Sequence, residues 1–223
     1  MSRTKLNDRD LPSYTKGEEI FNMVSHIVGG GFAVIALILT VVLSAVKGNI
    51  WGIVSGAVYG TSLIMLYAMS SIYHGLKNVK AKKIMRILDH CTIFFLIAGT
   101  YTPILLCSIR KVSAVWAWAI FGIVWGCAAL GIVLNAIDLK RYAKFSMFAY
   151  IGMGWCIVMA AKITVKAIPF GGLIYLLAGG IAYTIGALLY AAGAKHKYMH
   201  SVFHIFVVLG SVLHFICILF YVI

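Results

Sequence analysis

The sequence predicts an all-α membrane protein in which seven transmembrane helices form one bundle and the N-terminus lies in the cytoplasm. The chain is 62% hydrophobic and carries only 11% charged residues, whereas a soluble domain of this size carries about a quarter charged residues. Apolar runs of about twenty residues, the length that crosses a bilayer, recur along the whole chain. Short polar segments separate these runs, so we expect one membrane domain and no separate soluble domain.

Seven apolar segments are long enough to cross about 30 Å of hydrocarbon as helices with a rise of about 1.5 Å per residue. A polar segment, residues 1–19, precedes the first of them, and we expect it on the cytoplasmic side. Residues 20–223 then form the seven-helix transmembrane domain. The expected helices cover residues 20–46, 50–74, 84–108, 113–136, 145–165, 171–194 and 199–222.

Each expected helix is bounded by a short polar or basic connection. Residues 47–49, Lys-Gly-Asn, join the first two helices, which are therefore antiparallel neighbours. The third helix follows a basic stretch from Lys77 to Lys83, and the seventh begins just after a second basic stretch that ends at Lys197. The remaining connections carry Arg110 and Lys111, Lys140 to Lys144, and Lys166.

The positions of the basic residues predict the orientation of the bundle. Lys and Arg concentrate in cytoplasmic loops, and one side of the predicted bundle has many more of them than the other. The richer side carries Arg3, Lys5, Arg9, Lys16, Lys77, Lys80, Lys82, Lys83, Arg86, Lys140, Arg141, Lys144, Lys195 and Lys197; the other carries Lys47, Arg110, Lys111, Lys162 and Lys166. We therefore expect a multi-pass protein of the cell's cytoplasmic membrane, with its C-terminus outside.

The formal net charge of +13 does not indicate nucleic-acid binding. The basic residues lie in short loops between apolar runs, which is typical of topology signals and of contacts with lipid headgroups. No feature of the sequence indicates a protein partner.

Four ionisable residues interrupt the apolar segments or lie at their ends: His74, Asp89, His200 and His204. A charge or an imidazole at membrane depth costs free energy, so it usually marks a functional site. With the predicted topology, all four lie near the cytoplasmic leaflet. Because His200 and His204 are four residues apart, they share one helical face, and Ser70 shares a face with His74 in the same way.

Three imidazoles gathered in an apolar bundle indicate a zinc site with a fourth position open for water. Asp89 would then hold or deprotonate that water, or serve as a direct fourth ligand. Each residue also has a simpler interpretation. The histidine pair could be an interfacial or packing feature, and Asp89 could be a carboxylate favoured by the dipole at a helix N-terminus.

Other polar residues in the apolar segments have less specific interpretations. Glu19, Asn22 and His26 lie on one face of the first helix, where capping and interfacial contacts compete with support of the metal ligands. We interpret His90 as a packing or interfacial residue, because it points away from its neighbour Asp89. His214 lies about 15 Å deeper than His204 along the last helix, so we interpret it as a buried polar contact and not as a ligand.

Five segments carry a family resemblance: Ser70–His74, Leu88–His90, His200–His204, Glu19–His26 and Gly99–Pro103. Together they resemble the haemolysin III branch of the progestin and adiponectin receptor family; the combination of the first three is specific, whereas each part alone is weak. The resemblance covers nearly the whole chain and implies seven helices with the N-terminus inside. It also implies a zinc ion near the cytoplasmic side, with His74, His200 and His204 as ligands and a water close to Asp89 and Ser70.

The resemblance further implies kinship with membrane hydrolases that include the alkaline ceramidases, and a lipid-accessible cavity beside the metal. Our first hypothesis is therefore a zinc-dependent hydrolase of lipid amides or esters, with Asp89 and Ser70 as catalytic residues and an acyl chain or a ceramide-like lipid as substrate. The alternative is a non-enzymatic protein, either a pore-forming haemolysin or a lipid-sensing, receptor-like protein, in which zinc is structural.

Overall fold

The computed structural model describes residues 4–192 and 196–223, and this part of the chain is helical apart from short connections. The long helices are α1 (Lys16–Val46), α2 (Ile50–Gly75), α3 (Val79–Pro103), α5 (Ala114–Asp138), α6 (Ala143–Gly154), α8 (Phe170–Ala192) and α9 (Met199–Cys217). Three of them continue as further helical turns, so that the described residues contain seven stretches long and apolar enough to cross a membrane. The predicted all-α, seven-helix architecture is confirmed.

The first helix begins at Lys16, before the apolar segment starts, because Thr15 caps it. The Thr15 hydroxyl oxygen accepts a hydrogen bond from the Glu18 N–H, and the Glu18 carboxylate accepts one from the Thr15 N–H at 2.8 Å. This capping box satisfies backbone donors that the first turn leaves free. Residues 16–19 therefore belong to the helix, and Glu19 occupies a defined position at its beginning.

Two of the continuations depart from α geometry. After Pro103, α3 becomes a π-helix over Ile104–Ile109 and ends in the short α4 (Arg110–Val112). Pro103 has no N–H to donate to the preceding turn, which accounts for a change of geometry at this position. The last helix also ends in a π-helical segment, Ile218–Val222.

The predicted helix 145–165 consists of three pieces. It comprises α6, a 3-10 segment over Cys156–Ala160, and α7 (Ala161–Ala167). The Tyr101 hydroxyl bridges the interruption: it donates to the Gly154 carbonyl at 2.8 Å and accepts from the Ile157 N–H at 3.0 Å. A side chain of α3 thus forms hydrogen bonds with backbone groups that would be paired within the helix if it were continuous.

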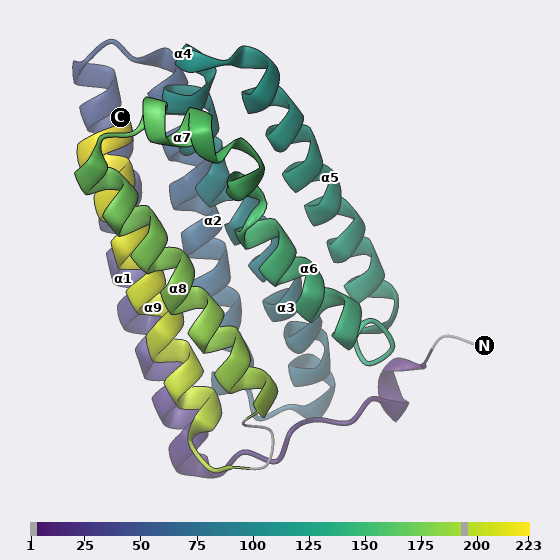
Figure 1. Ribbon diagram of the computed structural model, residues 1–223. Helices are drawn as coiled ribbons and strands as arrows, with labels where there is room; N and C mark the ends of the chain where they lie inside the picture. Colours follow the sequence, from purple (N-terminus) through teal and green to yellow (C-terminus); the bar gives the residue numbers. More distant parts are fainter. Residues whose placement is uncertain (1–3, 193–195) are drawn as a thin grey trace.

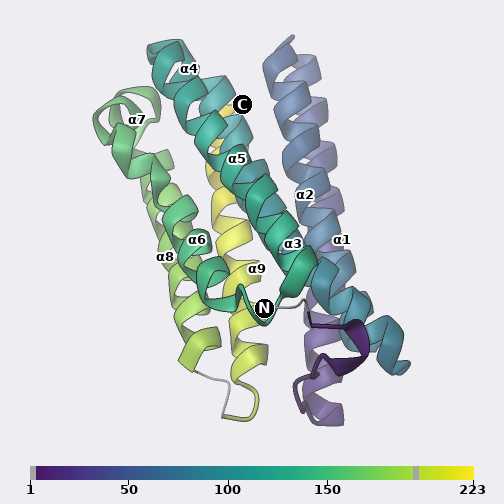
Figure 2. The same cartoon turned by 90° about the vertical axis from the view of Figure 1, so that its right-hand side faces the viewer.

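The helices form a bundle around α3, and 83% of the residues in the most apolar stretch of this helix are buried. Figures 1 and 2 show α1 beside α2 and α8 beside α9, with α5 and α6 on the outside of α3. Residues 4–15 run across the lower end of the bundle in Figure 1, where the α2–α3 and α5–α6 connections and the start of α9 also lie. We call this the basic end, since most of the Lys and Arg residues lie there. Two of the predicted basic residues, Arg3 and Lys195, lie outside the described residues, as do residues 193–194 of the sixth predicted helix.

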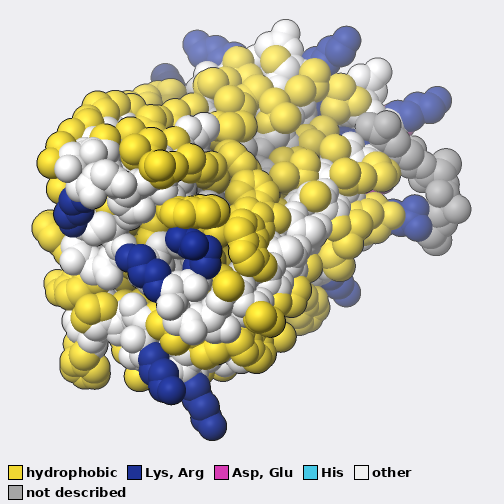
Figure 3. All heavy atoms as spheres, turned by 90° about the horizontal axis from the view of Figure 1, so that it is seen from above, with side chains coloured by type: hydrophobic (Ala, Val, Ile, Leu, Met, Phe, Trp, Pro, Cys, Tyr) yellow, Lys and Arg dark blue, Asp and Glu magenta, His cyan; other side chains and the backbone are white. Residues whose placement is uncertain are grey.

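Large apolar side chains cover the sides of the bundle. Val28 is 66% exposed, Val115 79% and Phe148 77%, a degree of exposure that fits contact with lipid chains. Figure 3 looks onto the end opposite the basic end and shows hydrophobic side chains over much of it, with a few Lys and Arg side chains among them. The chain is a multi-pass membrane protein. Which end faces the cytoplasm stays a prediction.

Candidate metal centre

Three histidines meet inside the bundle near its basic end. His74 lies in the last turn of α2, and His200 and His204 lie in the first two turns of α9. The His200 Nε2 atom is 3.4 Å from His74 Nε2 and 3.1 Å from His204 Nε2, and the ligand atoms of all three lie within 4.8 Å of one another. Residues that are far apart in the chain therefore share one centre, as their predicted depth indicated.

Hydrogen bonds at the outer nitrogens orient two of the three rings. His74 Nδ1–H donates to Glu19 Oε2 at 2.6 Å. The Ser25 hydroxyl donates to the Asn22 carbonyl at 3.0 Å, which leaves its oxygen to accept from His204 Nδ1–H at 3.4 Å. A neutral imidazole that donates through Nδ1 carries a free lone pair on Nε2. His74 and His204 therefore direct lone pairs toward the same centre.

This geometry fits a tetrahedral metal ion. Zinc binds histidine nitrogens at about 2.0–2.1 Å, so two nitrogens in a tetrahedral site lie about 3.3 Å apart. The two Nε2–Nε2 distances, 3.4 and 3.1 Å, agree with this value. Without a metal ion, His200 Nε2–H can donate a hydrogen bond to one of the other two imidazoles, and a metal ion would replace that proton. Three histidine ligands also leave one coordination position for another group.

Glu19 acts on the centre through His74. Its second carboxylate oxygen accepts a hydrogen bond from Lys82 Nζ at 2.6 Å, so α1, the end of α2 and the start of α3 are connected by one polar chain. A carboxylate on the outer nitrogen of a metal-binding histidine holds the ring in place and makes it a stronger ligand. Of the two interpretations of Glu19, the structure favours contact with the candidate ligand His74.

The rest of this face of α1 supports the start of α9. The Ser201 hydroxyl donates to Asn22 Oδ1 at 2.6 Å. His26 stacks on His204, with ring centroids 3.7 Å apart and planes at 12°. Tyr198, directly before α9, has a left-handed backbone (φ 60°), and its N–H donates to Glu18 Oε1 at 2.7 Å. These contacts place the His200–His204 turn against α1.

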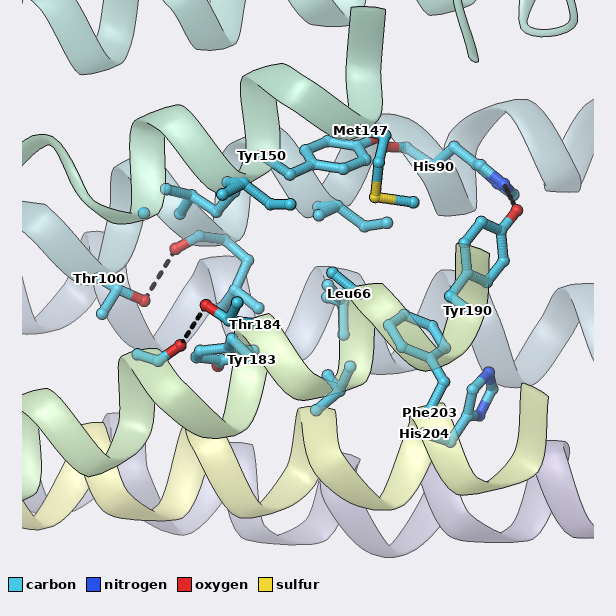
Figure 4. Close-up of a pocket in the computed structure, with 18 of the residues that line it drawn as sticks. Leu66, His90, Thr100, Met147, Tyr150, Tyr183, Thr184, Tyr190, Phe203 and His204 are labelled. Carbon is cyan, nitrogen blue, oxygen red and sulfur yellow. Dashed lines mark hydrogen bonds between the residues drawn. The ribbon is translucent and has the colours of Figure 1, made fainter. Parts of the chain in front are cut away.

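A cavity of about 150 Å³ lies beside the three histidines. Figure 4 shows His204, Phe203, Tyr190 and His90 at one end of it, and Thr100 and Thr184 at the other. Most of the side chains between these ends are aliphatic or aromatic; among them are Leu66, Ile93, Ile97, Met147, Tyr150 and Val207. The cavity can therefore hold an apolar chain with its polar end near the histidines.

Asp89 and Ser70 line the same cavity. The Ser70 side chain is buried, and that of Asp89 is 13% exposed. Among the described residues, Asp89 does not belong to the set whose ligand atoms converge. This placement matches a residue that acts beside the metal. The assignment of individual roles to the five site residues stays a prediction.

His214 and His90 differ in how well their position was predicted. His214 Nε2–H donates to the Leu176 carbonyl at 3.1 Å, which confirms a buried polar contact. His90 donates through Nδ1 to the Arg86 carbonyl at 2.8 Å, so its Nε2 accepts from the Tyr190 hydroxyl at 3.3 Å. It lies on the cavity wall beside the centre, and its Nδ1 is 3.6 Å from Asp89 Oδ2, so the expectation that it points away from Asp89 is wrong.

Tyr14 is the neighbour of the centre that sequence reasoning missed. Its ring lies almost parallel to that of His200, with centroids 5.0 Å apart and planes at 17°. A single aromatic residue in a polar segment carries no periodic signal, and only the path of residues 4–15 across the basic end brings it here.

The fold and the site define a class of protein: a multi-pass, seven-helix membrane protein with a candidate three-histidine metal centre inside the bundle. The profile of the haemolysin-III related family matches residues 14–215. The chain belongs to this family, as its sequence motifs predicted.

Similar proteins support this assignment. The chain is 38% identical over 205 residues to Hemolysin-3 of Bacillus cereus, an alignment that covers 92% of each protein. It is 36% identical over 208 residues to a Hemolysin-3 homolog of Bacillus subtilis (strain 168), which covers 93% of this chain and 96% of the relative. A more distant relative is the human monocyte to macrophage differentiation factor, which is 24% identical over 188 residues, 81% of this chain and 75% of the relative.

Proposed function

We propose that this protein is a zinc-dependent membrane hydrolase that cleaves an amide or ester bond of a lipid. One observation carries the proposal: two Nε2–Nε2 distances of 3.1 and 3.4 Å, typical of a zinc site, occur at the wall of an apolar cavity that also contains a carboxylate, Asp89. His74, His200 and His204 are the proposed zinc ligands.

Bound zinc supplies Lewis-acid chemistry, since it activates water near neutral pH and polarises a carbonyl group. In the proposed reaction, Asp89 accepts a proton from the attacking water. The Ser70 hydroxyl lines the same cavity and donates to the oxygen on which negative charge develops. Asp89 then returns the proton to the leaving nitrogen or oxygen as the C–N or C–O bond breaks, so that water and an amide or ester give a fatty acid and an amine or alcohol.

The cavity supports a lipid as the substrate. Its wall is mostly apolar, so it favours an acyl chain, and its polar end holds the proposed catalytic groups. With the N-terminus in the cytoplasm, as the basic residues predict, the centre lies near the cytoplasmic leaflet of the cell membrane. A ceramide-like lipid could then bind with its amide at the histidines and its acyl chain along the cavity.

Metal analysis of purified protein tests the centre. We expect about one zinc per chain in the wild type and a large loss in His74→Ala. His196→Ala is the matched control, because His196 is exposed in the connection before α9. Equal zinc in wild type and His74→Ala would refute the assignment of the ligands.

Lipid hydrolysis tests the reaction. We expect zinc-loaded protein to release fatty acid in a single turnover from a ceramide or from an ester lipid. Asp89→Asn should bind zinc but release no fatty acid. No release from any member of a panel of amide and ester lipids, by folded and zinc-loaded protein, would refute the enzymatic function.

A structural role for zinc is the second candidate, and the origin of the ligands favours it. His74 comes from α2 and the other two from α9, so a metal ion would tie together helices from opposite ends of the chain. In a haemolytic or lipid-sensing protein of this kind, zinc would raise the unfolding temperature without turnover. Haemolysis by a folded, metal-free variant would separate that activity from the enzyme.

A further inference from the structure

His200 differs from the other two histidines in its outer nitrogen. His74 Nδ1 is bonded to Glu19, and His204 Nδ1 is next to Ser25. His200 Nδ1 is buried and has no hydrogen-bonding partner among the described residues. A metal-binding histidine is normally held by a hydrogen bond at this position, so the orientation of the His200 ring has to come from other contacts.

Aromatic rings surround His200 instead. Tyr14 stacks on it with centroids 5.0 Å apart and planes at 17°. Tyr190 and Phe203 lie 5.6 and 5.5 Å away, at 56° and 35°. Tyr14 is the most nearly parallel of the three, and its ring centroid is also 5.7 Å from that of His74. Only Tyr14 among these residues lies outside the helix bundle.

The segment that carries Tyr14 is held at both of its ends. Directly after it, Thr15 caps α1. Before it, Arg86 donates to the Asp10 carbonyl at 2.7 Å and Arg9 donates to the Ile137 carbonyl at 2.8 Å. Lys140 also pairs with the Asp10 carboxylate at 3.0 Å and lowers its pKa.

Residues 4–15 therefore form a strap across the basic end, with further bonds from Thr4 N–H to Asp138 and from Lys83 to the Asn7 carbonyl. Figure 1 shows this path running along the lower end of the bundle, below α3, to the start of α1.

We propose that Tyr14 is a positioning residue for the metal ligand His200, and that the strap formed by residues 4–15 thereby determines how tightly the centre binds its metal ion. The inference rests on the proposed metal centre. Stacking on Tyr14 holds the orientation of the His200 ring, as a hydrogen bond does at the other two histidines. The Tyr14 ring also covers the centre from the basic end. Metal exchange through this end then requires the strap to move.

The test uses full-length protein in detergent and compares Tyr14→Ala, Tyr14→Phe and wild type. We expect Tyr14→Ala to lower zinc affinity about three- to tenfold, the range for loss of one aromatic contact, and to release zinc faster to a chelator. The visible spectrum of bound Co²⁺ should change as well. Tyr14→Phe keeps the ring and should match the wild type in all three measurements. Arg9→Ala, which loosens the strap away from the centre, should speed up zinc release.

Equal affinity, release rate and Co²⁺ spectrum in Tyr14→Ala and wild type would overturn the inference. If Tyr14→Ala does not fold, Tyr14→Leu keeps apolar bulk without a ring and is held to the same outcomes. Modification of His200 by diethyl pyrocarbonate in metal-free protein gives a separate measurement, and we expect it to be faster in Tyr14→Ala than in Tyr14→Phe. If the wild type binds no metal, the proposed centre is refuted. If diethyl pyrocarbonate modifies His200 equally fast in Tyr14→Ala and Tyr14→Phe, the proposed role of Tyr14 is refuted.

Discussion

His204 and His214 occupy the same helix and line the same cavity, yet their surroundings differ. They are ten residues apart on α9, which is about 15 Å along the axis. At His204, Nδ1 is turned toward Ser25 and Nε2 toward two other imidazoles. At His214, Nε2–H is bonded to the Leu176 carbonyl of α8.

The comparison teaches that burial alone does not give a histidine a function. Both side chains are costly at membrane depth. The Leu176 carbonyl occupies His214 Nε2, and the buried Nδ1 has no hydrogen-bonding partner and no second imidazole beside it among the described residues, whereas the partner of His204 leaves Nε2 free toward two other imidazoles. Which nitrogen is occupied, and by what, separates a structural histidine from a candidate metal ligand.

The largest expected effect is on zinc affinity, when His204 and His214 are each replaced by alanine in separate variants. His204→Ala removes a proposed ligand, so we expect zinc affinity to fall by more than about a hundredfold, the upper range for loss of an outer partner. His214→Ala should keep the wild-type zinc content and lower only the unfolding temperature. Chelator competition measures the zinc affinity of both variants. Similar zinc loss in the two variants would remove the distinction between the two regions.

Asp89→Asn should act on turnover and not on zinc. Loss of a general base lowers the rate by about 10²–10⁴-fold, while the three histidines are unchanged. The measurement is fatty-acid release under single-turnover conditions, together with zinc content. If zinc is lost along with activity, Asp89 is a direct ligand, and the division of roles proposed for the centre is wrong.

A smaller effect is expected at the outer partner of His74. Glu19→Gln should lower zinc affinity about 10- to 100-fold, because the carboxylate that orients and polarises the ring is lost. Asp8→Asn is the matched control: it makes the same change from carboxylate to amide at an exposed residue that has no contact with a histidine among the described residues. Equal affinities in the two variants would show that the Glu19–His74 bond does not support the metal.

The smallest effect should be confined to the His214 region. A methyl group added at Gly179 would collide with the His214 ring, whereas nothing lies near the corresponding position of Gly180. Gly179→Ala should therefore destabilise the protein by about 1–3 kcal/mol through overpacking, with unchanged zinc content. Thermal unfolding beside Gly180→Ala checks this, and a loss of zinc in Gly179→Ala would show that the two ends of the cavity are coupled.

Much of the fold and of the centre could be predicted from local patterns. Apolar length indicated the seven helices, and four-residue spacing placed His200 and His204 on one face. The start of α1 at Lys16 was missed although Thr15 and Glu18 form a capping signal, because the polar residues 16–19 lower the hydropathy there. The interruption after Gly154 has no local signal, since a hydroxyl from α3 stabilises it.

The sequence by itself determined which residues cross the membrane, and which polar residues share one depth, because both follow from length and periodicity along single helices. Only the tertiary structure decided that Glu19 holds His74, that Tyr14 covers His200, that His90 lines the cavity and that a carbonyl of α8 occupies His214. Each of these contacts joins segments that are distant in the chain. Their partners depend on how the helices pack, and helical periodicity carries no information about that.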